Sequence, residues 1–423
     1  MYLVIVQRWF STLFHRVWRK GVMRSGLVTG LILVALVVGL SVAYRERGRG
    51  HLHKLKEKIV TERQDVPAPR PGGQEAIVLT RSRMMGDSMP EFLSATMLPG
   101  RGMNVLQITA YIPGKGEVNL LASPSVEAAA SAMTGTDADA NGQTSLAMGG
   151  AFEVPWADRI WGAPSATHGA IVWRGHSITL PAEGSGGLIL AEAADPDPAG
   201  TTALPDGGQA KAVFHPGDFG THWPSKMEVT VTVLLSSRSI DVTVIAHNVG
   251  DVAEPVGIGW RPRFAILDGN RGQMRLRIPG EKRAETRGSG KGLPTGALLP
   301  VAGTSYDFTM PGGARLGGTN LDDCFMALRQ DLLDSGPVAE LRDPGSNYGL
   351  RLTTLSSTIK AMHVIAPADG DFVSIEPQFN YPDPFGREWA KDTDTGIVVL
   401  QPGQSTQWKV RLELFSLGGE PTM

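Results

Sequence analysis

Glu376 stands at the end of a run that is typical of a half-buried strand, and its carboxylate is well placed to act as a base. Val373 and Ile375 supply the alternating apolar positions before it. Pro377 follows at once, and because proline lacks a ladder donor we expect it to end the strand there. Partial burial raises the pKa of a carboxyl group, which suits a general base. An N-cap or a surface salt bridge is the alternative interpretation of this residue taken alone.

Four further motifs come before this run, and their order is more specific than any one of them. They are Glu153-Val-Pro-Trp-Ala-Asp-Arg159-Ile160, Thr167-His168-Gly169, Leu293-Pro-Thr-Gly296 with Asp307-Phe308 after it, and Leu321-Asp-Asp-Cys-Phe325. Together with Ile375-Glu-Pro-Gln378, this series resembles the aldose 1-epimerase (galactose mutarotase-like) family over roughly residues 76–418.

The resemblance implies an all-β fold, a β-supersandwich with an open cleft that binds the ring of an aldose or a substituted hexose. The family's reaction interconverts α and β anomers. A carboxylate removes the proton of the C1 hydroxyl while an acid protonates the ring oxygen, and ring closure on the other face reverses both transfers. The resemblance implies no metal and no organic cofactor.

The same resemblance assigns roles to individual side chains. Glu376 is expected to be the base, and His168 corresponds to the first of the family's two site histidines. Asp322 corresponds to an acceptor for sugar hydroxyls, with Asp323 beside it. Arg159 corresponds to a hydroxyl-binding donor.

The family's second site histidine is replaced by Arg261. Arginine keeps its proton above about pH 12, so it cannot shuttle protons at neutral pH. Arg261 is therefore expected to stabilise a negative oxygen, or to bind a carboxylate or phosphate substituent. His168 becomes the expected acid, because imidazole titrates near neutrality. Gln378 completes the expected binding residues.

The missing histidine favours an alternative function, a non-catalytic carbohydrate-binding module of the cell envelope. A third hypothesis is a structural envelope component that docks another protein. The site residues have structural interpretations too. Arg159 pairs with Asp158 or Glu153 in one of them, and Asp322 and Asp323 form a helix N-cap in another.

The composition is that of a globular protein rather than a disordered one. The chain has 423 residues, of which 42% are hydrophobic and 19% are charged. A net charge of −2 leaves no electrostatic footprint for nucleic acid. Cys324 is the only cysteine, which excludes an intramolecular disulfide and a cysteine-based metal cluster.

Strand patterns dominate the chain from residue 76 onward, so residues 76–423 are predicted to form one β-sandwich domain. Residues 228–234 and 240–246 alternate cleanly and predict a hairpin. Residues 123–150 are rich in small and polar residues and predict a flexible insertion. Within them, Asp137, Asp139 and Asn141 match the opening of a calcium loop, but the closing glutamate is replaced by Met148.

Residues 25–44 carry no charge and predict a transmembrane helix or signal anchor, because twenty residues at about 1.5 Å each span the ~30 Å hydrocarbon layer. The lipid bilayer is thus an expected partner. Residues 1–24 read as a basic amphipathic segment and residues 45–75 as a linker. Basic residues flank both sides, yet a single pass of the bacterial inner membrane with a periplasmic domain is preferred. Cleavage after Ala43, as in a signal peptide, is the alternative.

Overall fold

The structure is a computed structural model that describes residues 32–42, 44–45, 67–136, 139–161, 170–180, 186–195, 200–287 and 292–418. The chain divides into two units, Met1–Ala68 and Pro69–Met423. In the first unit, residues 32–42 and 44–45 are helical. Among the residues described, no helix is long and apolar enough to cross a membrane. Residues 25–31 and 43 of the predicted span lie outside the described residues, as do residues 1–24 and most of the predicted linker.

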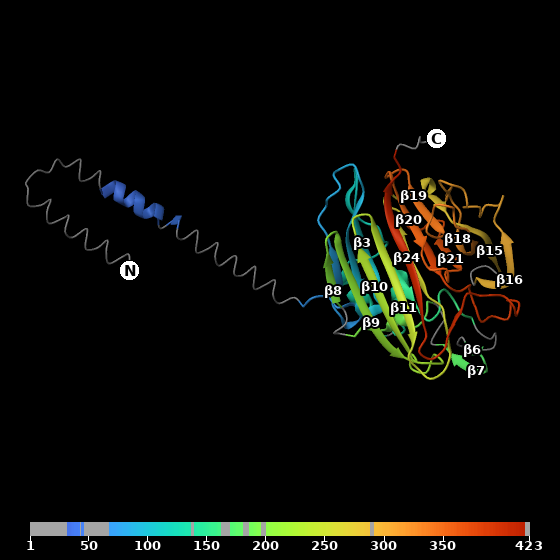
Figure 1. Cartoon of the computed structure of the whole chain (residues 1–423). Coiled ribbons are helices and arrows are strands. Elements are labelled where there is room, and N and C mark those ends of the chain that lie inside the picture. Colours follow the sequence, from blue (N-terminus) through green and yellow to red (C-terminus); the bar gives the residue numbers. More distant parts are fainter. Residues whose placement is uncertain are drawn as a thin grey trace, which may run out of the picture. The chain divides into compact units, whose positions relative to one another are not determined.

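The second unit is built from two large antiparallel sheets, which Figure 1 shows as two layers. In the described residues the larger sheet has eleven strands. In spatial order they are β1 (Ile77–Thr80), β2 (Glu91–Leu98), β3 (Asn104–Ile112), β5 (Gly150–Glu153), β13 (Gly259–Ala265), β22 (Phe372–Gln378), β21 (Ala361–Ala366), β18 (Leu321–Leu328), β15 (Gly280–Arg287) and β16 (Leu293–Pro300), with β4 (Gly116–Asn119) paired to β3.

The smaller of the two sheets has nine strands within the described residues. Their order is β17 (Ala314–Arg315), β14 (Arg275–Arg277), β19 (Val338–Asp343), β20 (Tyr348–Thr354), β24 (Ser405–Ser416), β11 (Ser239–Asn248), β10 (Met227–Leu235), β9 (Gly207–Gly217) and β8 (Gly200–Leu204). Two short ribbons pair β12 (Glu254–Val256) with β23 (Val398–Leu400), and β6 (Ala170–Trp173) with β7 (His176–Thr179). The helices described in the second unit are α3 (Val126–Ala132) and the 3₁₀ turns η1 (Pro71–Gly73), η2 (Pro99–Arg101), η4 (Gln143–Ala147), η5 (Ile189–Ala191) and η6 (Arg271–Gln273).

The hairpin of β10 and β11 confirms the strand prediction from alternation. Valines and threonines alternate along β10, and burial alternates with them residue by residue. Leu235 pairs with Ile240 at the turn, where Ser236 Oγ donates to the carbonyl of Ser239. β-Branched residues on one face of a pleated strand pack well against a second sheet, which is why this sequence forms a strand with one buried face.

The core lies between the two large sheets. Trp260 and Phe325 enter it from the larger sheet, and Trp408 and Val231 enter it from the smaller one. Successive side chains of a strand point to opposite faces, so the residues between these core positions point out of the sandwich. On the larger sheet, that outer face carries the polar groups of the candidate site.

Pro377 does not end its strand, contrary to the sequence prediction. β22 continues to Gln378, and Pro377 pairs in register with Met362 of β21. On the side of β22 that faces β13, no residues are paired between Ser374 and Gln378. The strand tolerates a residue without an N–H because that side of the ladder is already interrupted.

Segment 123–150, predicted as a flexible insertion, contains α3 and η4. Ala129 and Met133 pack with Leu98 in a small cluster of their own. Asp139 is not free to act as a calcium ligand, because its buried carboxylate is paired with Arg101 at 2.9 Å. Asp137 lies outside the described residues.

Candidate active site

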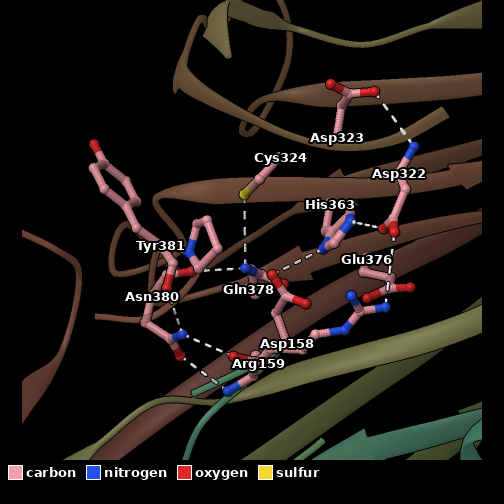
Figure 2. Close-up of polar contacts among 12 residues, drawn as sticks. Asp158, Arg159, Asp322, Asp323, Cys324, His363, Glu376, Gln378, Asn380 and Tyr381 are labelled. Atoms are coloured by element: carbon pink, nitrogen blue, oxygen red, sulfur yellow. Dashed lines mark hydrogen bonds and ion pairs between the residues drawn. The ribbon is translucent and has the colours of Figure 1, made fainter. Parts of the chain in front are cut away.

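Three neighbouring strands of the larger sheet, β18, β21 and β22, place the central side chains. Cys324 of β18 lies opposite His363 of β21 in register, and His363 lies opposite Glu376 of β22. Because side chains alternate along a strand, Asp322 lies on the same face as Cys324. On the neighbouring strands, Val364 next to His363 and Ile375 next to Glu376 point the other way, into the core. Side chains from three separate stretches of sequence thus meet on one outer face (Figure 2).

Arg261 of β13 lies between two buried carboxylates of this face. Its Nε is 3.0 Å from Glu153 Oε1 and 3.0 Å from Glu376 Oε2, and its Nη2 is 4.0 Å from Asp158 Oδ1. Glu376 also accepts a hydrogen bond from Ser374 Oγ at 3.0 Å. All three carboxylates are buried, and Arg261 is the cation that they share.

A second group of ion pairs joins Asp158 to His363 and His363 to Asp322, as Figure 2 shows. His363 Nδ1 lies 3.1 Å from Asp158 Oδ2, and His363 Nε2 lies 2.8 Å from Asp322 Oδ1. Asp322 reaches the surface with 45% of its side chain exposed, and its Oδ2 is 3.7 Å from Nη2 of Arg159. His363 therefore connects the buried carboxylate of Asp158 with the accessible carboxylate of Asp322.

Asn380 fixes the loop that carries Asp158 and Arg159. Its Oδ1 accepts from the backbone N–H of Ala157 at 3.0 Å, and its Nδ2 donates to the carbonyl of Ala157 at 2.9 Å. Gly257 makes this clasp possible, because a Cβ there would lie 2.0 Å from Asn380 Oδ1. The loop after β5 is thereby held against the end of β22.

The pKa values of the four carboxyl groups are shifted in two directions, upward for Glu153 and Glu376 and downward for Asp158 and Asp322. Burial raises the pKa of Glu153 to about 7, and it also raises the pKa of Glu376, with Arg261 opposing both shifts. The hydrogen bond from His363 lowers the pKa of Asp322 to about 2. Burial would raise the pKa of Asp158, but His363 outweighs it and lowers that pKa. Asp158 and Asp322 are thus ionised at neutral pH, whereas the pKa values of Glu153 and Glu376 are shifted toward neutral pH.

A small open pocket lies over this face. Asp322, Arg159, His363 and Asp158 supply its polar wall, and Trp161 is among its apolar residues. Hydroxyl-rich ligands need this combination of charged acceptors and donors beside an aromatic side chain. In the part of the chain that the structure describes, no three His, Cys, Asp or Glu side chains are grouped so as to hold a metal ion.

The predicted polar residues fall on two different faces. Arg159 pairs with Asp322, and Glu153 pairs with Arg261 instead of with Arg159. Asp323 points to the opposite face of β18 and is bound by Arg283 at 3.0 Å (its position is visible in Figure 2). Asp323 is therefore removed from the expected binding residues.

Four further expectations need correction or lie beyond the described residues. Asp322 and Asp323 are in a strand, so the helix N-cap interpretation is wrong. Arg261 is buried and its Nε is paired with Glu153 and Glu376, so its expected role in binding a carboxylate or phosphate of a ligand is not supported. Gln378 is buried and donates to the carbonyl of Asn380. His168 lies outside the described residues.

Sequence reasoning missed His363 and Asn380, and it gave Glu153 and Asp158 only a secondary part. A signal for His363 exists in the run Ala361-Met-His-Val-Ile-Ala366, where one titratable side chain interrupts an apolar strand. Its importance comes from the register of β21 against β22, which no single segment encodes.

Comparisons with known proteins identify a family from the sequence and a fold from the structure. The sequence profile described as aldose 1-epimerase matches residues 201–413, just over half of the chain. This range contains Arg261, Asp322, His363 and Glu376. A search of curated protein sequences finds no match.

Solved structures show the same fold. A galactose mutarotase-like protein from Clostridium acetobutylicum aligns with a TM-score of 0.63 at 16% identity, over 79% of this chain and 95% of that one. An aldose epimerase homologue from C. elegans aligns at 0.60 and 14% identity, over 81% and 99%. A galactose 1-epimerase from Lactobacillus acidophilus aligns at 0.56 and 15% identity, over 80% and 98%. The second unit therefore has a mostly β, galactose mutarotase-like fold.

Proposed function

The chain belongs to the aldose 1-epimerase family, and from this premise we propose that it binds an aldose in the pocket over β18 and β21 and interconverts its α and β anomers. One observation carries the proposal. Glu376, Asp322 and Arg159 come from three separate segments, yet a continuous set of ion pairs through Arg261, Asp158 and His363 joins them on one face of the sheet.

The proposed reaction divides the work between a base and an acid. Glu376 takes the proton of the C1 hydroxyl, and its raised pKa makes it a stronger base than an ordinary glutamate. His168 is the proposed donor to the ring oxygen. Asp322 and Arg159 hold the sugar hydroxyls as acceptor and donor, so that the ring-opened aldehyde turns in place before closure.

The proposed substrate is a neutral aldose rather than a sugar phosphate or a sugar acid. Four carboxylates, Glu153, Asp158, Asp322 and Glu376, face this pocket or lie directly beneath it, against the cations Arg159, Arg261 and His363. The most exposed of these carboxylates is Asp322, which would repel an anionic substituent. Calorimetry that compares a neutral hexose with its 6-phosphate tests this, and tighter binding of the phosphate would contradict it.

The activity test is the rate at which the optical rotation of a freshly dissolved α-anomer relaxes with and without the protein. We expect acceleration for at least one neutral hexose. Equal rates with and without protein for every hexose tested would contradict the proposed catalysis.

A second candidate function, sugar binding without anomer exchange, is favoured by the burial of Glu376. Its side chain is only 1% exposed and lies against Arg261, and it is not part of the pocket wall described above. A sugar would have to displace part of that cover to reach the carboxylate. Measured binding with no change in the rate of mutarotation would support this alternative.

We also propose that residues 25–44 anchor the chain in a bacterial inner membrane, with the sugar site on the periplasmic side. The support is the uncharged run between Arg24 and Arg45. Fractionation of cells that express the full chain tests it. The double substitution Leu33→Arg and Val37→Arg should release the protein from the membrane fraction, and a soluble wild-type chain would contradict the anchor.

A further inference from the structure

His363 is buried among the charged groups beneath the pocket, with a carboxylate oxygen at each ring nitrogen. Asp158 Oδ2 lies 3.1 Å from Nδ1, and Asp322 Oδ1 lies 2.8 Å from Nε2. Carboxylates only accept hydrogen bonds, and a neutral imidazole carries a single N–H. A neutral ring would therefore set an unprotonated nitrogen against one of the two carboxylates. Two carboxylate oxygens at these distances favour the charged imidazolium.

We propose that His363, as an imidazolium, is a positioning residue of the sugar site: it fixes Asp322 toward the ligand and keeps the buried Glu376 ionised. This role rests on the proposed function. Asp322 is nearly half exposed, and an exposed aspartate is free to change rotamer unless a partner holds it. His363 holds its Oδ1, which leaves Oδ2 beside Arg159 at the pocket wall.

The second part of the role follows from the balance of buried charge. The groups that face His363 are Asp322 and Cys324 from β18, Asp158 from the loop after β5, and Glu376 from β22. Arg261 serves Glu153, Asp158 and Glu376 at the same time. Without a second cation, three buried carboxylates would share one guanidinium, and at least one of them would take up a proton.

The direction of the shifts agrees with this account. Burial alone would lower the pKa of His363, but Asp158 and Asp322 raise it well above the usual value. Burial raises the pKa of Glu376, and the charges of Arg261 and His363 hold that rise down. Loss of the imidazolium is therefore expected to raise the pKa of Glu376 further.

The test compares His363→Gln with His215→Gln in the pH profile of kcat/KM for mutarotation. His215 of β9 is a matched control, because it also lies between two carboxylates, at 2.7 Å from Asp195 and 3.0 Å from Glu228, but is 52% exposed and outside the site. We expect His363→Gln to move the acid limb upward by about one pH unit, which is an approximately tenfold loss on that limb, and to weaken sugar binding. His215→Gln should keep the wild-type profile. A wild-type profile and affinity in His363→Gln would overturn the proposal.

A second measurement separates this inference from the proposed catalysis and does not depend on a variant that folds. In ¹⁵N-histidine NMR of the wild-type chain, both ring nitrogens of His363 should remain protonated at pH 8. A neutral ring at pH 8 would overturn the positioning role, whatever the enzymatic activity. If the wild-type chain catalyses no mutarotation while the ring is charged, the proposed catalysis fails and the arrangement of His363 and Asp322 stands as that of a binding site.

Discussion

Arg261 Nε lies 3.0 Å from Glu376 Oε2, and both side chains are buried on the outer face of the larger sheet. The expected base of the site is therefore paired with a cation that cannot release its proton. Burial raises the pKa of Glu376 while Arg261 lowers it, so the protonation of this carboxyl group depends on the guanidinium beside it.

The first prediction concerns the stability that this ion pair supports. Arg261→Met would leave Glu153 and Glu376 buried without their common cation, and we expect it to lower the free energy of unfolding by about 3–5 kcal/mol. Arg411→Met is the control, because Arg411 pairs with Asp241 at the surface, where such a pair contributes at most about 1 kcal/mol. Urea unfolding measures both. Equal losses in the two variants would contradict the buried role of Arg261.

Asp322 provides a prediction about binding. Asp322→Asn removes the charged acceptor at the pocket wall but preserves its shape, and a hydrogen bond to a charged group contributes about 1.5–3 kcal/mol. We expect the affinity for a neutral hexose to fall at least tenfold in calorimetry, and the free energy of unfolding to fall as well, because the buried imidazolium of His363 loses one of its two carboxylate partners. The neighbouring Asp323→Asn changes a side chain that points to the opposite face, so it should leave sugar affinity intact. A larger loss of affinity in Asp323→Asn would contradict the assignment of faces.

Asn380 links the stability of the fold to the geometry of the site. Asn380→Ala removes both hydrogen bonds to Ala157 and leaves buried backbone groups unpaired, which we expect to cost about 1–3 kcal/mol. Because the loop then loses its clasp, sugar affinity should fall as well. The exposed Gln330→Ala, remote from this loop, serves as the control in thermal unfolding and calorimetry. Wild-type affinity in Asn380→Ala would show that the loop holds its position without the clasp.

Glu254, which lies outside the site, is expected to make the stability of the fold depend on pH. Among the residues that the structure describes, neither of its carboxylate oxygens has a hydrogen-bond partner, and burial raises its pKa to about 8. A raised pKa in the folded state means that this group's contribution is present below the unfolded value near 4.5 and is lost as the pH rises toward 8. Glu254→Gln does not titrate, so its stability relative to wild type should increase over this range, by at most about 1.4 kcal/mol per pH unit. Parallel curves of unfolding free energy against pH would contradict this.

Strands and individual candidate residues were predictable where the signal is local. Alternation in β10 and β11 marks both strands, and the order of short motifs leads to Glu376, Asp322, Arg159 and Arg261. These signals lie within a few residues of one another along the chain. A resemblance read from such motifs therefore identifies side chains one at a time.

The partners of those side chains could not be predicted, because they are set by register between strands. His363 meets Glu376 only when β21 pairs with β22, and Arg261 meets Glu153 only when β13 pairs with β5. Asp323 shows the same limit: one position along β18 separates the face of the pocket from the opposite face. Pro377 was misjudged because proline in a central strand is permitted where the neighbouring ladder is interrupted.

The most direct test of the account is the rate of mutarotation of a neutral hexose by the wild-type chain and by Glu376→Gln, measured by polarimetry at pH 7. Glutamine fills the same volume but cannot accept the C1 proton, so the account predicts acceleration by the wild type and a loss of about 10²–10⁴-fold in the variant. A variant as active as the wild-type chain would contradict the assignment of Glu376 as the base.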